Sequence, residues 1–307
     1  MKLNRKQTIV IGIVFAIILI TTFLNLDLRE RKHIRDGIWV NGYGIGRVDL
    51  DVLAKNGVKN IFLHESAVKR FGVSTVEKWI SDAESKNISV HLWVQCFYNG
   101  TWINPIDTSK KDFNYLYFNK KINEIENYTS INGVKGIMLD YVRYPGDAYK
   151  YDYSWWGTGV NGHNAITKFV AMVDDKLRYT NKTLSITVMP ERGDGTKFYG
   201  QDVGALSHHV DVIVPMAYTG NYKKDSIWIK EIAKYYSEKS KPANVCIGIQ
   251  DYVSDANEQP LNITELRVNC QSALDGGSDG IALFNWELMK NWFDLRTLNG
   301  TSEEILI

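Results

Sequence analysis

The chain has 307 residues, 44% of them hydrophobic, and its formal net charge is +1 at pH 7. A charge this close to zero provides no overall attraction to nucleic acid, so no nucleic-acid partner is expected. The three cysteines, Cys96, Cys246 and Cys270, are odd in number and lack C-x-x-C spacing. This excludes a disulfide framework and a cysteine zinc site, and Cys96 and Cys246 are interpreted as buried free thiols.

The first apolar segment is residues 9–26, a nearly unbroken run (IVIGIVFAIILITTFLNL) that is long enough to cross a bilayer. Because it lacks a small-x-small cleavage site, it predicts an uncleaved single-pass anchor after a short basic segment, residues 1–8; a buried core helix is the alternative. We expect a cell-membrane protein in which a linker, residues 27–36, joins this anchor to an extracytoplasmic domain, residues 37–307. The N-x-S/T sequons exceed the roughly two or three that chance would give, which favours the outside of the cell. They begin at Asn87, Asn99, Asn127, Asn181, Asn262 and Asn299.

Beyond residue 36, short apolar runs alternate with longer amphipathic stretches. The apolar runs predict eight strands: Gly37–Val40, Asn60–His64, Ser89–Phe97, Val134–Tyr141, Leu184–Met189, Val210–Tyr218, Val245–Tyr252 and Gly280–Trp286. The amphipathic stretches predict helices over Ser74–Lys86, Tyr115–Tyr128, Asn164–Tyr179, Ser226–Ser240 and Ile263–Asp275. Ser74 and Glu77 have the spacing of a capping box, Thr264 and Glu265 mark the start of the last helix, and Gly276-Gly277 end it.

Nearly continuous hydrophobic strands that alternate with helices are typical of a parallel sheet covered by helices. Eight repetitions predict an α/β fold, the (β/α)8 TIM barrel, as one domain after the anchor. A doubly wound open sheet is the alternative. Its phosphate loop would be Asn41-Gly-Tyr-Gly-Ile-Gly46, but this G-x-G-x-G is one residue short of the dinucleotide fingerprint.

The C-terminal ends of barrel strands converge on one mouth, where the chemistry of this fold takes place. Carboxylates, aromatic rings and amides follow the predicted strands, and sugar chemistry uses them for proton transfer, stacking and hydroxyl binding. The aromatic segment 149–156 (YKYDYSWW) is either a substrate platform or a packed flap. The side chains predicted to bind substrate are Trp93, Gln95, Tyr141, Arg143, Tyr144, Tyr218, Gln250, Asp251, Tyr252, Asn285 and Trp286.

The most specific segment is Gly136-Ile-Met-Leu-Asp140-Tyr-Val-Arg143-Tyr-Pro145, which ends a buried strand on a carboxylate. A charge there is costly unless it is paired or functional, and Arg143 is close enough in sequence to pair with Asp140 and hold it ionised. The segment resembles the strand-four signature LDY(I/V)RYP of bacterial glycoside-hydrolase-like family 10 and related glycosidase families. Residues 211–218 and 247–252 resemble the sixth and seventh strands of that family. The resemblance implies a glycosidase of cell-wall glycan strands, with Asp140 as the principal catalytic carboxylate.

A more distant similarity is to the family-18 chitinases, whose sixth strand reads M-x-Y, as Met216-Ala-Tyr218 does here. The catalytic Glu of those enzymes, counted on from Asp140, falls on Val142, so their arrangement is not expected. The second carboxylate must then come from another strand. Glu191 on the neighbouring strand and Glu287 across the mouth are equal candidates, with Asp251 as a further one.

The sequence therefore predicts a membrane-bound glycoside hydrolase that acts on a cell-wall or surface polysaccharide. A catalytically inactive carbohydrate-binding barrel is the alternative, and an intact second carboxylate near Asp140 would distinguish the two. A metal-dependent amidohydrolase needs several histidines at strand ends, and only His64 and His91 come near. No metal and no cofactor is therefore predicted, and the oligomeric state is left open.

Overall fold

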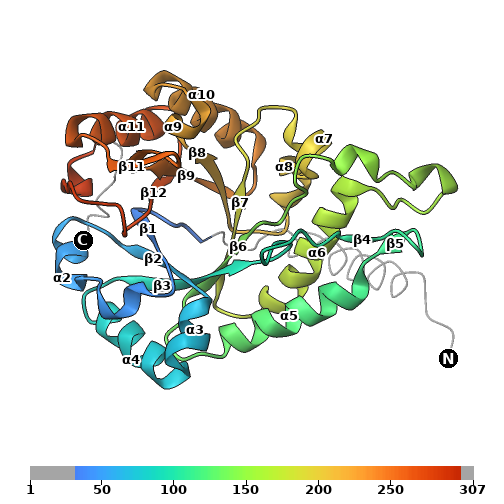
Figure 1. Ribbon diagram of the computed structural model, residues 1–307, viewed down its shortest axis with the longest axis horizontal. Coiled ribbons are helices and arrows are strands. Elements are labelled where there is room, and N and C mark those ends of the chain that lie inside the picture. The colour runs from blue at the N-terminus through green and yellow to red at the C-terminus, as the bar shows by residue number, and fades with distance from the viewer. Residues whose placement is uncertain (1–31, 299–307) are drawn as a thin grey trace, which may run out of the picture. The chain divides into compact units, whose positions relative to one another are not determined.

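Parallel strands form the centre of the computed structural model, which describes residues 32–298 (Figure 1). Within these residues eight strands close into a barrel in the order β1-β12-β9-β8-β7-β6-β3-β2. Each barrel strand pairs in parallel with its neighbours, which confirms the predicted TIM barrel. The strands are β1 (Gly37–Val40), β2 (Asn60–His64), β3 (Ser89–Gln95), β6 (Gly136–Asp140), β7 (Thr183–Val188), β8 (Val212–Ala217), β9 (Asn244–Gln250) and β12 (Gly280–Phe284).

Helices cover the outside of the barrel and follow its strands in sequence (Figure 1). The longer ones are α4 (Val73–Glu84), α5 (Tyr115–Thr129), α6 (Gly162–Leu177), α10 (Ser226–Lys239) and α11 (Ile263–Asp275). Shorter ones are α2 (Leu50–Lys55), α3 (Ser66–Phe71), α7 (Gly195–Tyr199), α8 (Val203–Leu206) and α9 (Thr219–Tyr222). The five predicted helices are thus all present, with ends that differ by two residues or fewer.

The capping box predicted at the start of α4 is wrong. Helix α4 begins at Val73, and its N-cap is Gly72, which has φ 78° and forms no side-chain cap. Because Gly72 joins α3 directly to α4 through a backbone conformation that favours glycine, the capping box expected at Ser74 does not form. Glu77 instead accepts a hydrogen bond from the Asn132 N–H (3.0 Å). Helix α11, in contrast, begins at Ile263 as predicted, and the Asn262 side chain caps it by accepting a hydrogen bond from the Thr264 N–H (2.8 Å).

Side chains alternate between the inside and the outside of the barrel along each strand, as the two-residue period of a strand requires. One apolar cluster fills the inside and a second, larger one lies between the strands and the helices. All three cysteines are buried and free, in agreement with the sequence interpretation of Cys96 and Cys246. The inner cluster consists of Ile34, Trp39, Phe62, Met138, Val212, Val214, Cys246 and Ala282, with Trp93 and Phe284 packed against it.

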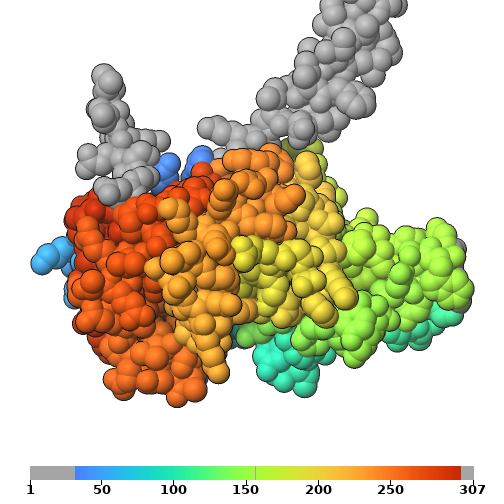
Figure 2. Space-filling model, turned by 90° about the horizontal axis from the view of Figure 1, so that it is seen from above, coloured from blue at the N-terminus to red at the C-terminus, as the bar shows by residue number. Residues whose placement is uncertain are grey.

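The loops after the strands carry small elements of their own. Two antiparallel hairpins form, β4 (Ile106–Asp107) with β5 (Asp112–Phe113), and β10 (Tyr252–Ser254) with β11 (Asn257–Pro260). Short 3-10 turns are η1 (Gly44–Gly46), η2 (Ala148–Lys150), η3 (Ser154–Trp156) and η4 (Leu295–Thr297). The segment with η2 and η3, yellow-green in Figure 2, stands out from the side of the barrel.

The predicted anchor, residues 9–26, lies outside the described residues, as do the basic segment, residues 1–8, and the sequon at Asn299. These assignments, the linker and the placement of the domain outside the cell therefore stay predictions. Among residues 32–298, no helix combines the length and the hydropathy that a membrane span needs.

Candidate active site

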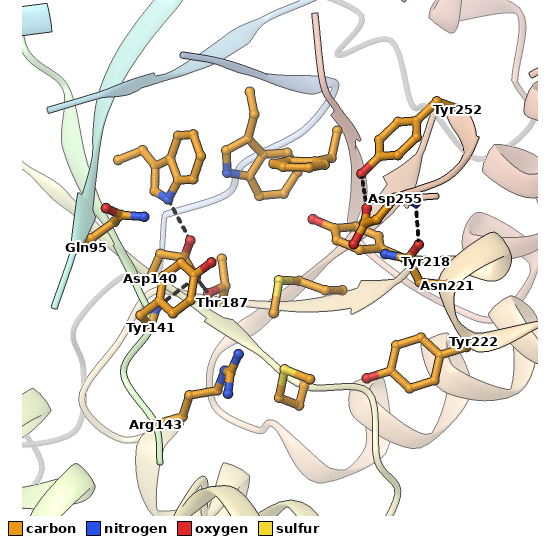
Figure 3. A pocket seen from close by; sticks show the side chains of 15 residues that line it. Gln95, Asp140, Tyr141, Arg143, Thr187, Tyr218, Asn221, Tyr222, Tyr252 and Asp255 are labelled. Atoms are coloured by element: carbon orange, nitrogen blue, oxygen red, sulfur yellow. Dashed lines mark hydrogen bonds between the residues drawn. The ribbon is translucent and has the colours of Figure 1, made fainter. Parts of the chain in front are cut away.

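A cavity of about 320 Å³ lies at the C-terminal ends of the barrel strands (Figure 3). Its lining includes the candidate catalytic residue Asp140 and six of the predicted substrate-binding residues: Trp93, Gln95, Tyr141, Arg143, Tyr218 and Tyr252. The remaining lining residues were not predicted from the sequence: Trp39, Thr187, Met189, Met216, Asn221, Tyr222, Asp255 and Phe284.

Asp140 is the last residue of β6, and its carboxylate is held by three hydrogen-bond donors. The Trp93 indole N–H, from β3, donates to Oδ2 (2.8 Å), while the Thr187 hydroxyl, from β7, donates to Oδ1 (2.5 Å). The backbone N–H of Tyr141 also donates to Oδ1 (2.7 Å). Figure 3 shows Thr187 and Tyr141 beside the carboxylate. Three donors and only 8% residue exposure fix the carboxylate in place.

The backbone after Asp140 is strained. Tyr141 has φ 52°, in the left-handed region that a tyrosine rarely adopts. Its ring stacks on Tyr98 (5.0 Å between centroids) and lies against Trp102 (5.7 Å). Strain of this kind concentrates at functional sites, and here it turns an aromatic side chain toward the cavity right beside the carboxylate.

The ion pair expected between Arg143 and Asp140 does not form. The Arg143 guanidinium lies 4.7 Å from the Trp102 ring centroid and donates to the carbonyl of Tyr144 (3.1 Å). The physical reason is that the Asp140 oxygens already have donors from three directions, whereas the guanidinium finds aromatic faces and a carbonyl. Arg143 still lines the cavity, where its charge is available to a ligand.

A second carboxylate, Asp255, reaches the same cavity from the β10–β11 hairpin. The Tyr252 hydroxyl donates to its Oδ1 (2.6 Å), and its own backbone N–H donates to the Asn221 side-chain oxygen (2.9 Å). Gln250 fixes Asn221 in turn, donating to the same oxygen (3.2 Å). Figure 3 places Asp255 and Asp140 on opposite sides of the cavity. A carboxylate on each side is the arrangement that acid–base chemistry on a bound molecule needs.

Tyr218 and Phe284 form an aromatic part of the cavity lining. The rings stack with centroids 5.3 Å apart, and the Tyr218 hydroxyl bonds to no other residue in 32–298. Burial raises the pKa of Tyr218 well above its ordinary value, and the charge of Asp140 adds to this effect. The phenol therefore stays protonated and can donate a hydrogen bond to a ligand.

The two predicted partner carboxylates lie elsewhere. Glu191 lines a neighbouring cavity and accepts hydrogen bonds from the hydroxyls of Tyr199 (3.2 Å) and Tyr222 (2.9 Å). Glu287 accepts a hydrogen bond from the Asn41 N–H (2.9 Å), and burial raises its pKa. Neither lines the cavity of Asp140; Glu191 reaches it only through Tyr222.

The other predicted substrate-binding residues lie behind the cavity wall. Gln250 is fully buried and accepts hydrogen bonds from the Gly220 and Asn221 N–H groups (3.0 and 3.3 Å). Asp251 is buried and accepts from the Asn285 N–H (3.0 Å). Tyr144, Asn285 and Trp286 do not line the cavity either. These residues support the loops that carry the site instead of contacting its interior.

The aromatic segment 149–156 packs away from the cavity. Tyr151 stacks on Tyr144 (5.2 Å between centroids) and joins a small cluster with Ile106, next to the β4–β5 hairpin. Tyr149 and Trp155 are exposed, and neither lines the cavity. The structure therefore favours the packed flap over the platform.

Metal-ligating side chains do not gather in the described part of the chain: no group of three His, Cys, Asp or Glu there could hold an ion. Of the two histidines considered, His91 is buried and bonds through Nε2 to the Asn60 side-chain oxygen (3.1 Å), and burial lowers its pKa to about 4. His64 bonds through Nδ1 to the Ser66 hydroxyl (2.8 Å). Both rings are thus held by a hydrogen bond within the fold, although the buried Nδ1 of His91 has no partner in residues 32–298.

Comparison with known families agrees with this geometry. Residues 66–265 match the sequence profile of a family described as "Putative glycosyl hydrolase domain". The chain belongs to this family. The match includes Asp140, Asp255 and most of the cavity lining, and it supports the glycosyl hydrolase resemblance at this coarse level. No curated protein sequence gives a significant match.

Solved structures of similar fold include several glycan-degrading enzymes. A class V chitinase from Pseudomonas fluorescens Pf-5 has a TM-score of 0.64 at 14% identity, covering 87% of this chain and 99% of that one. A chitinase from Chromobacterium violaceum ATCC 12472 has 0.60 at 13% identity, covering 88% and 100%. The spore cortex-lytic enzyme SleL from Bacillus cereus has 0.59 at 14% identity, covering 84% and 72%. At these identities the likeness is one of fold.

With the barrel established, part of the missed lining follows from strand periodicity. Trp39 and Phe284 belong to the inner cluster or pack against it, and Met216 is in phase with the inward-facing Val214. Thr187 alternates with Ile186 and Val188, which face the helices. Asp255, Asn221 and Tyr222 lie in loops or on a short loop helix beyond the strand ends, where no periodic signal reaches.

Proposed function

We propose that this member of the glycosyl hydrolase domain family cleaves glycosidic bonds in a cell-wall or surface polysaccharide, with Asp140 and Asp255 as its catalytic carboxylates. The observation that carries the proposal is that the two carboxylates lie on opposite sides of one aromatic-walled cavity (Figure 3). Glycoside hydrolysis ordinarily needs such a pair flanking the scissile bond. The resemblance of residues 136–145 to the LDY(I/V)RYP signature supports the same role for Asp140.

The environments of the two carboxylates suggest different roles. Asp140 is buried and held by three donors, which suits the carboxylate that faces the positive charge of an oxocarbenium-like transition state. Asp255, which is exposed at the rim, is then left for proton transfer to the departing sugar oxygen. Tyr218 and Arg143 lie in the same cavity to bind hydroxyls or a ring substituent.

In this proposal Asp255 is the second catalytic carboxylate, for which the sequence offered Glu191 and Glu287 as equal candidates and Asp251 as a further one. Neither of these residues lines the cavity, and both are engaged by other groups. Glu191 has an indirect role in this proposal, because its hydrogen bond holds Tyr222, which does line the cavity.

The substrate class rests on two further supports. Residues 9–26 predict an anchor that would hold the barrel at the membrane, within reach of cell-wall glycan. One structural neighbour is a spore cortex-lytic enzyme and others are chitinases, so barrels of this shape serve enzymes of glycan degradation.

The test is release of reducing ends from purified cell-wall glycan by the wild-type chain and by the Asp140→Asn and Asp255→Asn variants. Release by the wild type and its loss in both variants are expected. Full activity in either variant would remove that residue from the pair. Binding of glycan without release by the wild type would leave the rival reading, a carbohydrate-binding barrel without catalysis.

A further inference from the structure

A second, larger cavity lies beside the candidate active site. Its volume is about 710 Å³, and it is formed by α3, α5 and the residues that follow β2 and β3. We name it the lysine cavity after Lys69, Lys120 and Lys121, which line it together with Glu65 and Glu124. The side-chain amides of Asn99, Asn123 and Asn127 complete a polar lining that suits a hydroxylated ligand.

Only a thin wall of side chains separates the lysine cavity from the active site. Gln95 lines both cavities. His64, on the lysine side, packs edge-on against Trp93, on the active-site side, with centroids 4.6 Å apart. Tyr98 and Tyr141 also meet across the wall, with their rings stacked and centroids 5.0 Å apart. The two cavities therefore adjoin each other at Gln95.

Positive charge exceeds negative charge in the lysine cavity. Lys121 pairs with Glu124 (2.7 Å), and Lys69 approaches the same carboxylate at 3.9 Å. Lys120 forms no ion pair with any residue in 32–298. The three ammonium groups thus share two carboxylates, and one of these, Glu65, is buried with one oxygen that has no hydrogen-bond partner.

Glu65 links this charge balance to the active site. Its Oε1 accepts a hydrogen bond from the Gln95 N–H (3.1 Å), so it fixes the residue that both cavities share. Burial raises the pKa of Glu65. With three lysines against two glutamates, the lining of the cavity carries one more positive group than negative groups.

From this arrangement we infer that the lysine cavity binds a carboxylate-bearing sugar of the same glycan chain whose scissile bond lies at Asp140. The inference rests on the proposed function and adds the substrate class, an acidic glycan. The asparagine amides would bind ring hydroxyls, and Lys69 and Lys120 would bind the carboxylate. A lysine excess of one matches a carboxylate, which carries a single charge, better than a phosphate. The carboxylate has two sources in glycans, a lactyl ether and a uronic acid.

Binding to three hexasaccharides tests this inference. The probes are N-acetylglucosamine hexamer, which is neutral, a peptide-free peptidoglycan strand, which carries a lactyl carboxylate on every second sugar, and hexagalacturonate. Calorimetry with the full chain carrying Asp140→Asn prevents cleavage during the measurement. A further Lys69→Gln/Lys120→Gln pair should weaken binding of a carboxylated probe by about tenfold and leave the neutral probe within about twofold. Lys234→Gln, on the exposed face of α10 and outside every cavity described above, is the matched control and should change nothing.

The outcomes separate the possibilities. A loss confined to the peptidoglycan strand assigns the lactyl source, and a loss confined to hexagalacturonate assigns the uronic source. The inference is overturned if the lysine variant binds all three probes as before, if it weakens them all equally, or if neither carboxylated probe binds. If the wild type cleaves no glycan but the lysine-dependent preference persists, the proposed hydrolysis fails while the acidic-glycan site stands.

Discussion

Two strands of the barrel, β6 and β9, each have a buried aspartate at or directly after their C-terminal end. Asp140 is the last residue of β6, and Asp251 directly follows β9; they are 8% and 1% exposed. Asp140 faces the cavity with three donors, whereas Asp251 lies behind the wall. The difference is one of phase. Asp140 is in register with the inward-facing Met138, and Asp251 is one residue out of register with the inward-facing Cys246.

This one-residue difference also separates the electrostatics of the two groups. Asp251 accepts the Asn285 N–H through one oxygen, and its other oxygen has no partner in the described part of the chain. Burial raises its pKa to about 8. A buried carboxyl that stays protonated at neutral pH suits a structural hydrogen bond, while a carboxylate with three donors suits catalysis.

The same substitution at both positions tests most directly whether Asp140 and Asp251 differ in function. Asp140→Asn removes the proposed catalytic charge and should lower glycan cleavage by about 10²- to 10⁴-fold. Asp251→Asn keeps the oxygen that accepts the Asn285 N–H and touches no cavity atom, so it should keep activity within about tenfold. Initial rates of reducing-end release measure both. Equal losses in the two variants would mean that phase does not distinguish their functions.

The pH dependence of stability gives the second contrast. Unfolding returns the pKa of Asp251 from about 8 to its ordinary 3.8. Between these values the folded state holds a proton that the unfolded state has released, so stability from this group falls as pH rises from about 4 to 8. Each unit of pKa difference corresponds to about 1.4 kcal/mol. Above pH 8 both states are ionised, so the stabilisation by Asp251 is gone and the free energy of unfolding no longer changes with pH through this group.

Urea unfolding of wild type and Asp251→Asn across this range measures that effect. The amide cannot ionise. The free energy of unfolding of the wild type should therefore fall relative to that of the variant as pH rises toward 8. The absolute offset includes the unpartnered amide hydrogens of the variant, and for this reason the slope is the readout. Parallel curves for the two proteins would show that Asp251 ionises normally in the fold.

The barrel itself was predictable, because eight nearly continuous apolar runs leave few other folds, and the strand ends follow directly. Asp140, Trp93 and Tyr218 were placed correctly in one cavity on that basis. Asp251 was not, since a strand end defined only to within one or two residues does not fix which way the last side chain points.

The rest of the site depends on contacts between loops. Asp255 reaches the cavity because the hairpin after β9 folds back and the Tyr252 hydroxyl and the Asn221 side chain hold it there. None of these contacts has a sequence period. The absent Arg143–Asp140 pair has the same origin, since the donors that displaced Arg143 come from other strands, Trp93 on β3 and Thr187 on β7.

Removing one hydrogen-bond donor of Asp140 should have a smaller effect and tests the role of that single hydrogen bond. Thr187→Val removes the hydroxyl at 2.5 Å and should lower kcat by about 10- to 100-fold with little change in KM, because a hydrogen bond to a charged group is lost. Ser185→Ala is the matched control. Its hydroxyl is equally buried on β7 but donates to the carbonyl of Ile137 (3.3 Å), away from Asp140. A similar kcat for both variants would place the role of Thr187 in packing alone.

The smallest expected effect concerns the carboxylate of Asp255, which accepts a hydrogen bond from the Tyr252 phenol. Tyr252→Phe removes the donor at 2.6 Å and keeps the ring, which packs near Phe284 with centroids 6.4 Å apart. One hydrogen bond of this kind corresponds to a two- to tenfold loss in kcat, at roughly constant thermal stability. The double variant Tyr252→Phe/Asp255→Asn should be no slower than Asp255→Asn alone, because the phenol acts only through the carboxylate it holds. An additional loss in the double variant would show that Tyr252 contacts the glycan itself.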